Sequence, residues 1–239
     1  MISPYDAIAE WNEQSLDGGS PVHSVALPAL LELTGDVAGL TVCDLACGTG
    51  ITARELAARG ATVTGIDVSL PLLEIAARSE NPVGIIYRQG DAQTLHAWQD
   101  SAFDGIACNL ALMDIPDLNS CLQAVARVLR PSGWFVFTIT HPCYQLPDSR
   151  WTGKRGGTVK REVRGYFNEG WWISDNPHGV RGQVGAYHRM LSTYIGALSE
   201  AGLMMDAMRE PQAEGEVANR VPGYREVPVV LGVRCRKSV

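Results

Sequence analysis

The chain has 239 residues, 46% hydrophobic and 19% charged, a composition typical of a globular domain rather than a disordered segment or a fibre. It carries 20 Lys and Arg against 26 Asp and Glu, a formal net charge of −6, which weakens the case for a nucleic-acid scaffold or an anionic membrane surface as partner. The charge balance does not argue against an enzyme that acts on a small molecule.

The six cysteines form no Cys-x-x-Cys pair and have no histidines at metal-ligand spacing, so we expect neither a disulfide framework nor a metal site. The N-terminus shows no basic start followed by an apolar run, and no apolar run approaches the roughly 18 residues of a membrane-spanning helix. These features predict a cytoplasmic protein without a signal peptide and without a membrane partner.

Strands and helices are expected to alternate along most of the chain. Periodicity predicts strands at 41–45, 61–66, 84–88, 102–109 and 134–139, and helices over 51–59, after a cap at Ser69 and after Asp117. The pattern lapses between about residues 141 and 188, and resumes with a helix over 191–201 and strands over 203–209 and 227–234. Apolar strands separated by helices predict an α/β fold, a Rossmann-like doubly wound, mainly parallel sheet with helices on both faces.

The turn after the first expected strand has the spacing Gly48-x-Gly50-x-x-Ala53, which also fits dinucleotide-binding proteins and is weak on its own. Asp44 lies just before it, at the end of the strand. A carboxylate there opposes a pyrophosphate and suits a cationic ligand, and no Lys or Arg lies in the turn. S-adenosylmethionine carries an ammonium and a sulfonium and no phosphate, so this turn fits it better than NAD.

Polar residues also follow the next three expected strands. Asp67 can accept hydrogen bonds from both ribose hydroxyls, Asp91 from an adenine amino group, and Asn109 closes the fourth strand. Each has a purely structural alternative: a helix cap for Asp67, a solvated turn for Asp91 and a local backbone cap for Asn109. Ligands of open α/β sheets bind at this edge, outside the carboxyl ends of the strands.

The motifs Asp44–Gly50, Thr64–Ser69, Gly90–Ala92, 103–109 and 129–134 together resemble the class I S-adenosylmethionine-dependent methyltransferases of the small-molecule type. The resemblance implies one domain over 1–239, with seven strands of which the last is antiparallel. It also implies an N-terminal cap helix at about 4–18 and a lid insertion at about 141–188. The chain lacks the Pro-Pro-Tyr that many nucleic-acid and protein N-methylating members carry after strand four.

S-adenosylmethionine is the cofactor that the resemblance implies, with Tyr5 at its methionine end. The expected cofactor-binding residues follow the strand ends and the cap: Tyr5, Asp44, Ala46, Gly48, Gly50, Asp67, Val68, Asp91, Ala92 and Asn109.

The lid insertion holds candidate substrate and catalytic residues. Aromatic side chains there either anchor the lid or stack on a planar substrate. His141 and His188 lie at the expected substrate mouth and are the candidate general bases, although each could instead hydrogen-bond the backbone to hold the lid. The expected substrate-binding residues are Trp11, Met113, Trp171, Trp172 and Tyr187.

The leading functional hypothesis is methyl transfer from S-adenosylmethionine to N or O of a small, planar metabolite. The alternatives are methylation of RNA or protein, which rests on the basic residues at 150–164, and a NAD-dependent oxidoreductase. We expect a small-molecule substrate and no nucleic acid as partner, and leave open whether the chain is a monomer or a homodimer.

Overall fold

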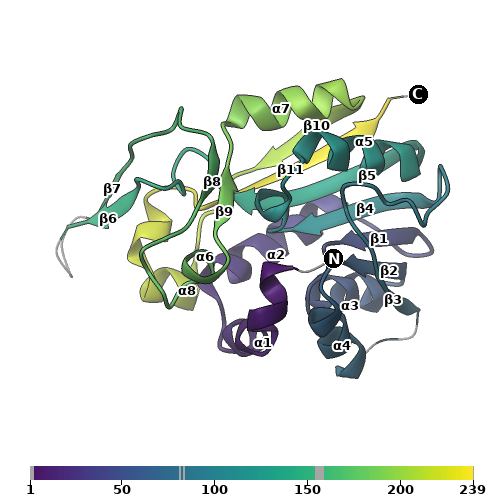
Figure 1. Cartoon of the computed structure of the whole chain (residues 1–239), viewed down its shortest axis with the longest axis horizontal. Helices are drawn as coiled ribbons and strands as arrows, with labels where there is room; N and C mark the ends of the chain where they lie inside the picture. The colour runs from purple at the N-terminus through teal and green to yellow at the C-terminus, as the bar shows by residue number, and fades with distance from the viewer. Residues whose placement is uncertain (1–2, 81, 83, 154–158, 239) are drawn as a thin grey trace.

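The computed structural model describes residues 3–80, 82, 84–153 and 159–238. Its centre is a seven-stranded sheet in the order β10-β11-β5-β4-β1-β2-β3 (Figure 1). The strands are β1 (Thr41–Leu45), β2 (Thr62–Asp67), β3 (Ile85–Gln89), β4 (Phe103–Asn109), β5 (Leu129–Thr140), β10 (Leu203–Arg209) and β11 (Val230–Lys237). β1 to β5 pair in parallel, and β11 runs antiparallel to both β5 and β10. The predicted α/β fold and its antiparallel last strand are confirmed.

Helices cover both faces of the sheet, as Figure 1 shows. α2 (Pro21–Thr34) and α3 (Ile51–Ala58) bury Leu30 and Leu56 against one face, and α5 (Leu118–Val128) and α7 (Leu191–Glu200) bury Leu122 and Leu198 against the other. Because both faces are covered, β1 is buried almost along its whole length, which explains its unbroken apolar run.

Two predicted helix starts are confirmed. Ser69 caps α4 (Leu70–Arg78) by accepting the backbone N–H of Leu72, and Asp117 caps α5 by accepting the N–H of Ser120 at 3.0 Å. These caps fix where α4 begins after β2 and where α5 begins on the segment that follows β4.

The N-terminal cap consists of a short 3-10 helix η1 (Pro4–Ile8) and α1 (Ala9–Asp17). Ala9 packs with Leu72 and Ile75 of α4, and Glu13 pairs with Arg78 at 2.6 Å. The cap therefore rests on α4, at the end of the sheet where β1 and β2 finish.

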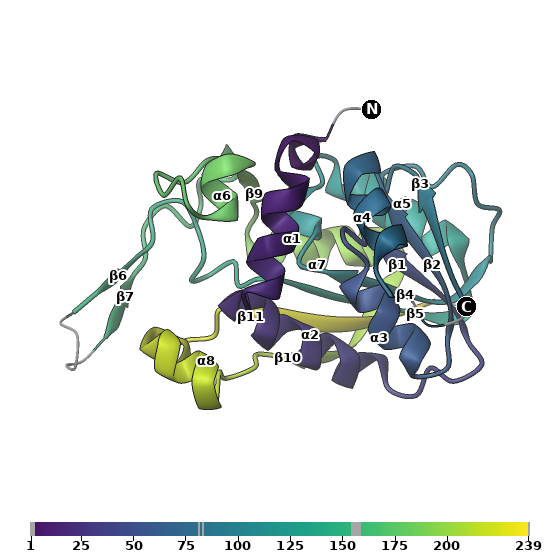
Figure 2. The ribbon, with the colours of Figure 1, turned by 90° about the horizontal axis from the view of Figure 1, so that it is seen from below.

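Residues 141–188 lie after β5, and we call their described part the lid. It contains two antiparallel hairpins, β6 (Arg150–Thr152) with β7 (Lys160–Glu162) and β8 (Gly170–Trp172) with β9 (Ala186–His188), and the short helix α6 (Val180–Gln183). In the described residues no lid strand joins the main sheet. Figure 2 shows α6 on the same side of the molecule as α1, so the lid and the cap face one another over the sheet edge.

Three features differ from expectation. α2 was not predicted, and it keeps Pro28 inside because its buried face against β5 and β11 outweighs the lost hydrogen bond. β5 begins at Leu129, with residues 130–133 bulging out where a break was expected. β11 covers Val230–Lys237 rather than 227–234, because α8 (Gly215–Arg220) and η3 (Pro222–Arg225) fill the connection from β10. No helix in the described ranges has the length and apolar character needed to cross a membrane.

Candidate functional site

A cavity of about 530 Å³ opens at the carboxyl ends of the strands, under the cap and the lid. This volume lies within the range of about 300–1,000 Å³ usual for small-molecule sites. One polar residue from the end of each of the first five strands, or just after it, lines the cavity: Asp44, Asp67, Asp91, Asn109 and Thr140. The sheet edge therefore brings together the four strand-end residues that the sequence singled out, and adds Thr140 to them.

The glycine turn after β1 forms the floor of this cavity. Gly48 has φ +52°, and no atom lies within 4 Å of the position that a Cβ would take there, so a ligand can approach the backbone closely. Gly50 has φ +79° and does not line the cavity, because it packs under the Tyr87 ring. Ala46 lines the cavity in a left-handed conformation, φ +54°.

Asp44 is 1% exposed, and its Oδ2 has no hydrogen-bond partner among the described residues. Burial raises the pKa of this carboxyl, and the charge of Asp67 adds to the rise. A backbone hydrogen bond from Ala53 lowers it, and the pKa that results is about 8. A buried carboxylate oxygen without a donor is costly, and a cationic group in the cavity would supply the missing donor. The ammonium of S-adenosylmethionine is such a group.

Asp67 holds the glycine turn in place. Its Oδ2 accepts the N–H of Gly48 and its Oδ1 accepts the N–H of Ser69, both at 2.8 Å. Burial raises its pKa, although these backbone bonds oppose the shift. Each carboxylate oxygen keeps a second lone pair, so the structural role shown here is compatible with the predicted ribose contact, which stays a prediction. Asp91 lines the cavity with its Oδ1 accepting the N–H of Gln93 at 2.9 Å.

Sequence reasoning missed His23, which lies in the first turn of α2 and lines the cavity. Its Nε2 is 3.3 Å from Nδ2 of Asn109, whose Oδ1 accepts the hydroxyl of Thr138 at 2.6 Å. Burial lowers the pKa of His23. The three residues come from α2, β4 and β5, and no local pattern in the sequence links them.

Sequence reasoning also missed the contact between cap and lid. The hydroxyl of Tyr5 donates to Oδ2 of Asp114 at 3.1 Å, and Arg181 of α6 donates to Oδ1 of the same carboxylate. Arg181 also donates to the carbonyl of Gly185 at 3.0 Å. Asp114 lies in η2 (Leu112–Asp114), lines the cavity, and connects the cap to the lid through these hydrogen bonds.

The predicted substrate residues divide into two groups. Met113, Trp171 and Tyr187 line the cavity, as do the predicted cofactor residues Val68 and Ala92. Trp11 and Trp172 are not among its lining residues, and Trp172 packs against the main core instead.

The two histidines proposed as general bases lie in the lid's own hydrogen-bond network. His141, 3% exposed, accepts the N–H of Cys143 on Nδ1 and donates from Nε2 to Glu210 at 2.8 Å. His188, 4% exposed, donates from Nε2 to the carbonyl of Tyr166 at 2.8 Å. Neither lines the cavity, so the structure gives both imidazoles lid-holding contacts, and their catalytic role stays a prediction.

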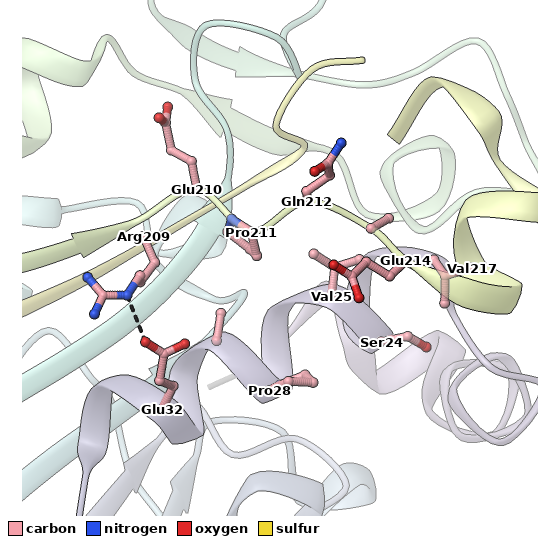
Figure 3. A pocket seen from close by; sticks show the side chains of 12 residues that line it. Ser24, Val25, Pro28, Glu32, Arg209, Glu210, Pro211, Gln212, Glu214 and Val217 are labelled. Atoms are coloured by element: carbon pink, nitrogen blue, oxygen red, sulfur yellow. Dashed lines mark hydrogen bonds and ion pairs between the residues drawn. The ribbon is translucent and has the colours of Figure 1, made fainter. Parts of the chain in front are cut away.

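A second hollow of about 430 Å³ lies between α2 and the segment 209–217 (Figure 3). Glu32 and Arg209 pair across its rim at 2.8 Å, while Glu210 turns away toward His141. Three of its four charged side chains thus have ion-pair or hydrogen-bond partners, Glu214 being the fourth, and none of the residues at the ends of β1 to β4 lines it. No cluster of three metal-ligating side chains occurs within the described part of the chain.

Residues 43–137 match the family described as a methyltransferase domain. The structure is similar to that of an S-adenosylmethionine-dependent methyltransferase from Mesorhizobium loti, with 29% identity and a TM-score of 0.75 over 87% of this chain and 96% of that protein. These similarities support a class I S-adenosylmethionine-dependent methyltransferase. The methyl donor of this class is S-adenosylmethionine, and the partnerless Oδ2 of Asp44 and the open face of Gly48 fit it.

The chain spans about half the length of the curated relatives that it matches. The ubiquinone biosynthesis O-methyltransferases of Alkalilimnicola ehrlichii and Bordetella avium are 32% and 35% identical over 144 and 123 residues. These matches cover 57% and 49% of this chain, and 58% and 51% of the two relatives. The chain thus matches little more than half of those proteins.

Proposed function

We propose that this chain transfers a methyl group from S-adenosylmethionine to N or O of a small, planar metabolite. The observation that carries the proposal is the carboxylate oxygen of Asp44 that has no hydrogen-bond partner among the described residues, in the cavity at the strand ends. Asp44 would pair with the ammonium of the donor, and Asp67 and Asp91 would bind its ribose and adenine. When bound, the donor supplies a methyl group on a cationic sulfur, so the chain's own task is to align the acceptor and exclude water.

The acceptor would lie on the lid side of the cavity. Trp171 and Tyr187 occupy paired positions in β8 and β9 and both line the cavity, so they offer flat apolar surface to a planar ring. Relatives that carry the name O-methyltransferase support oxygen over nitrogen as the acceptor atom.

Methylation of RNA or protein has less support. Arg150 pairs with Glu162, and Arg161 donates to the carbonyl of Tyr144 and stacks on Trp151, so these basic side chains are used within the lid. Lys154 and Arg155, which contributed to the basic count, lie outside the described residues.

The test offers the purified chain donor labelled on the methyl group, together with a metabolite extract below about 1 kDa, total RNA or unfolded protein. We expect label in a small aromatic product that mass spectrometry can identify, and much less label with an Asp67→Ala control at a donor concentration below the dissociation constant of that variant. Label confined to RNA or protein, or absent from all three samples while the donor binds, would overturn the proposal.

A further inference from the structure

His23 lies at the wall of the cavity where α2 meets the ends of β4 and β5. It is the third residue of α2, and its imidazole meets Asn109, the last residue of β4, 86 positions along the chain. Both side chains line the cavity beside the end of β4. In the described residues His23 is the one histidine among the cavity's lining side chains.

The hydrogen bonds around Asn109 indicate which ring nitrogen of His23 carries the proton. Thr138 Oγ1 accepts the N–H of Leu110 at 3.1 Å and donates its own hydrogen to Oδ1 of Asn109 at 2.6 Å. The amide oxygen is thereby committed to Thr138, and the NH₂ group faces His23. An NH₂ group can only donate, so Nε2 of His23 accepts and carries no proton, and the ring hydrogen is on Nδ1.

The surroundings of His23 suit a base that is neutral before the reaction. Burial lowers its pKa, which leaves the imidazole uncharged at neutral pH. The charged side chains that line the cavity are four carboxyls and one guanidinium, and the guanidinium is paired with one of the carboxyls: Asp44, Asp67, Asp91, Asp114 and Arg181. The other ionisable lining side chains, besides His23, are Tyr5, Cys47 and Tyr187. With Asp114 paired to Arg181 and Asp44 assigned to the donor's ammonium, Asp67 and Asp91 are the carboxylates left to stabilise the imidazolium that a proton transfer would create.

We propose that Nε2 of His23 accepts the proton of the acceptor's hydroxyl or N–H group, and that Asn109 is the positioning residue that keeps this nitrogen unprotonated. The inference rests on the proposed function and names a general base for it. The 3.3 Å contact from Asn109 is near the long end of hydrogen-bond distances, so a bound hydroxyl can replace it.

An oxygen lone pair forms the new bond to the methyl carbon, the electron pair of the broken carbon–sulfur bond stays on sulfur, and the hydroxyl proton moves to Nε2. The positive charge that leaves sulfur reappears on the imidazolium, which then releases the proton to solvent. The acceptor class is therefore one that still carries a proton at neutral pH, such as a phenol, rather than a tertiary amine.

The first arm of the test measures the tautomer directly in the ligand-free protein. We expect ¹⁵N spectra of labelled histidine to show His23, assigned by its loss in His23→Gln, protonated on Nδ1 alone at pH 7. The variant Asn109→Leu should lose this fixed tautomer. A spectrum showing His23 protonated on Nε2 overturns the proposal, whether or not a substrate is known.

The second arm compares His23→Gln with the matched control His178→Gln, an exposed lid histidine. We expect His23→Gln to lower the single-turnover rate by about 100- to 10,000-fold and to remove the acidic limb of its pH profile. Its affinity for S-adenosylhomocysteine and its Tm should stay close to wild type, and the control should be unchanged. A rate within threefold of wild type in both His23→Gln and His23→Asn overturns the proposal. Failure of the wild type to methylate any small molecule contradicts the proposed function instead.

Discussion

Oδ2 of Asp67 accepts the backbone N–H of Gly48 at 2.8 Å, so the end of β2 holds the turn that follows β1. The same carboxylate accepts the N–H of Ser69, which starts α4. One side chain thus fixes two of the walls between which the donor would lie.

We expect Asp67→Ala to lower the affinity for S-adenosylhomocysteine at least about tenfold, because charge-assisted hydrogen bonds contribute roughly 1.5–3 kcal/mol each. Loss of the turn alone could produce the same effect, so the test adds an analogue without the 2′ and 3′ ribose hydroxyls. Calorimetry should show that wild type discriminates against the analogue and that Asp67→Ala does not. A variant that keeps the full discrimination would show that Asp67 does not touch the ribose.

Asp44 links donor binding to pH. Its pKa of about 8 in the empty cavity keeps most molecules protonated at pH 7, and pairing with an ammonium favours the ionised form. Binding should therefore release about one proton per chain at pH 7. Binding enthalpies in buffers of different ionisation enthalpy measure this release. Asp44→Asn should abolish it, and equal enthalpies in all buffers for wild type would contradict the assignment.

The same shift predicts how the ligand-free protein responds to pH. A carboxyl whose pKa is higher in the folded state than in the unfolded state binds its proton more tightly when folded, so stability falls as pH rises toward the folded-state pKa. Asp44 and Asp67 are both shifted in this direction. We expect the Tm to fall between pH 5 and pH 8, and to fall less in Asp44→Asn. A slope that is the same in wild type and Asp44→Asn would count against a buried, partnerless carboxyl.

The carboxylate of Asp114 accepts a hydrogen bond from Tyr5 of the cap and pairs with Arg181 of the lid, and both side chains of this ion pair are largely buried. Removing the guanidinium in Arg181→Ala should free the β8–β9 hairpin and speed amide hydrogen exchange there by tenfold or more. Tyr5→Phe, which loses one hydrogen bond, should have a smaller effect. Arg150→Ala is the control, since its exposed pair with Glu162 lies in the other hairpin. Unchanged exchange in Arg181→Ala would mean that this contact does not hold the lid.

Trp171 and Trp172 are neighbours in β8 with different surroundings. Trp171 is 57% exposed and lines the cavity, whereas Trp172 packs against the core. Trp171→Ala should lower kcat/KM for the acceptor at least about tenfold with little change in Tm. Trp172→Ala should instead lower the free energy of unfolding by about 0.5–3 kcal/mol. Turnover, donor affinity and Tm on the two variants separate these outcomes, and equal losses of kcat/KM would remove Trp171 from the acceptor site.

Much of the fold could be predicted because its signals are local. β1 has the predicted bounds, and Ser69 and Asp117 cap helices where expected, because each signal lies within a few residues of the element that it starts. α2 was missed because it is apolar on most of its surface and contains Pro28, so it shows no clean helical period. Its position depends on the sheet that it covers.

The site could be predicted where it follows the strand ends, and not where distant elements meet. The three carboxylates Asp44, Asp67 and Asp91 lie at one edge because parallel strands share their carboxyl ends. The contacts of His23 with Asn109 and of Asp114 with Arg181 join residues 86 and 67 positions apart. No spacing rule connects such pairs, so the sequence predicted the lid histidines His141 and His188 as general bases and did not predict His23.

We expect the cavity at the strand ends to bind S-adenosylmethionine. Isothermal titration calorimetry with this donor, with S-adenosylhomocysteine and with NAD tests it most directly. The account predicts that both adenosyl compounds bind with a stoichiometry near one per chain, that NAD gives no saturable heat, and that Asp44→Asn weakens the adenosyl compounds at least about tenfold while keeping the fold. Folded wild-type protein that gives no heat with either adenosyl compound, or that binds NAD in their place, would contradict it.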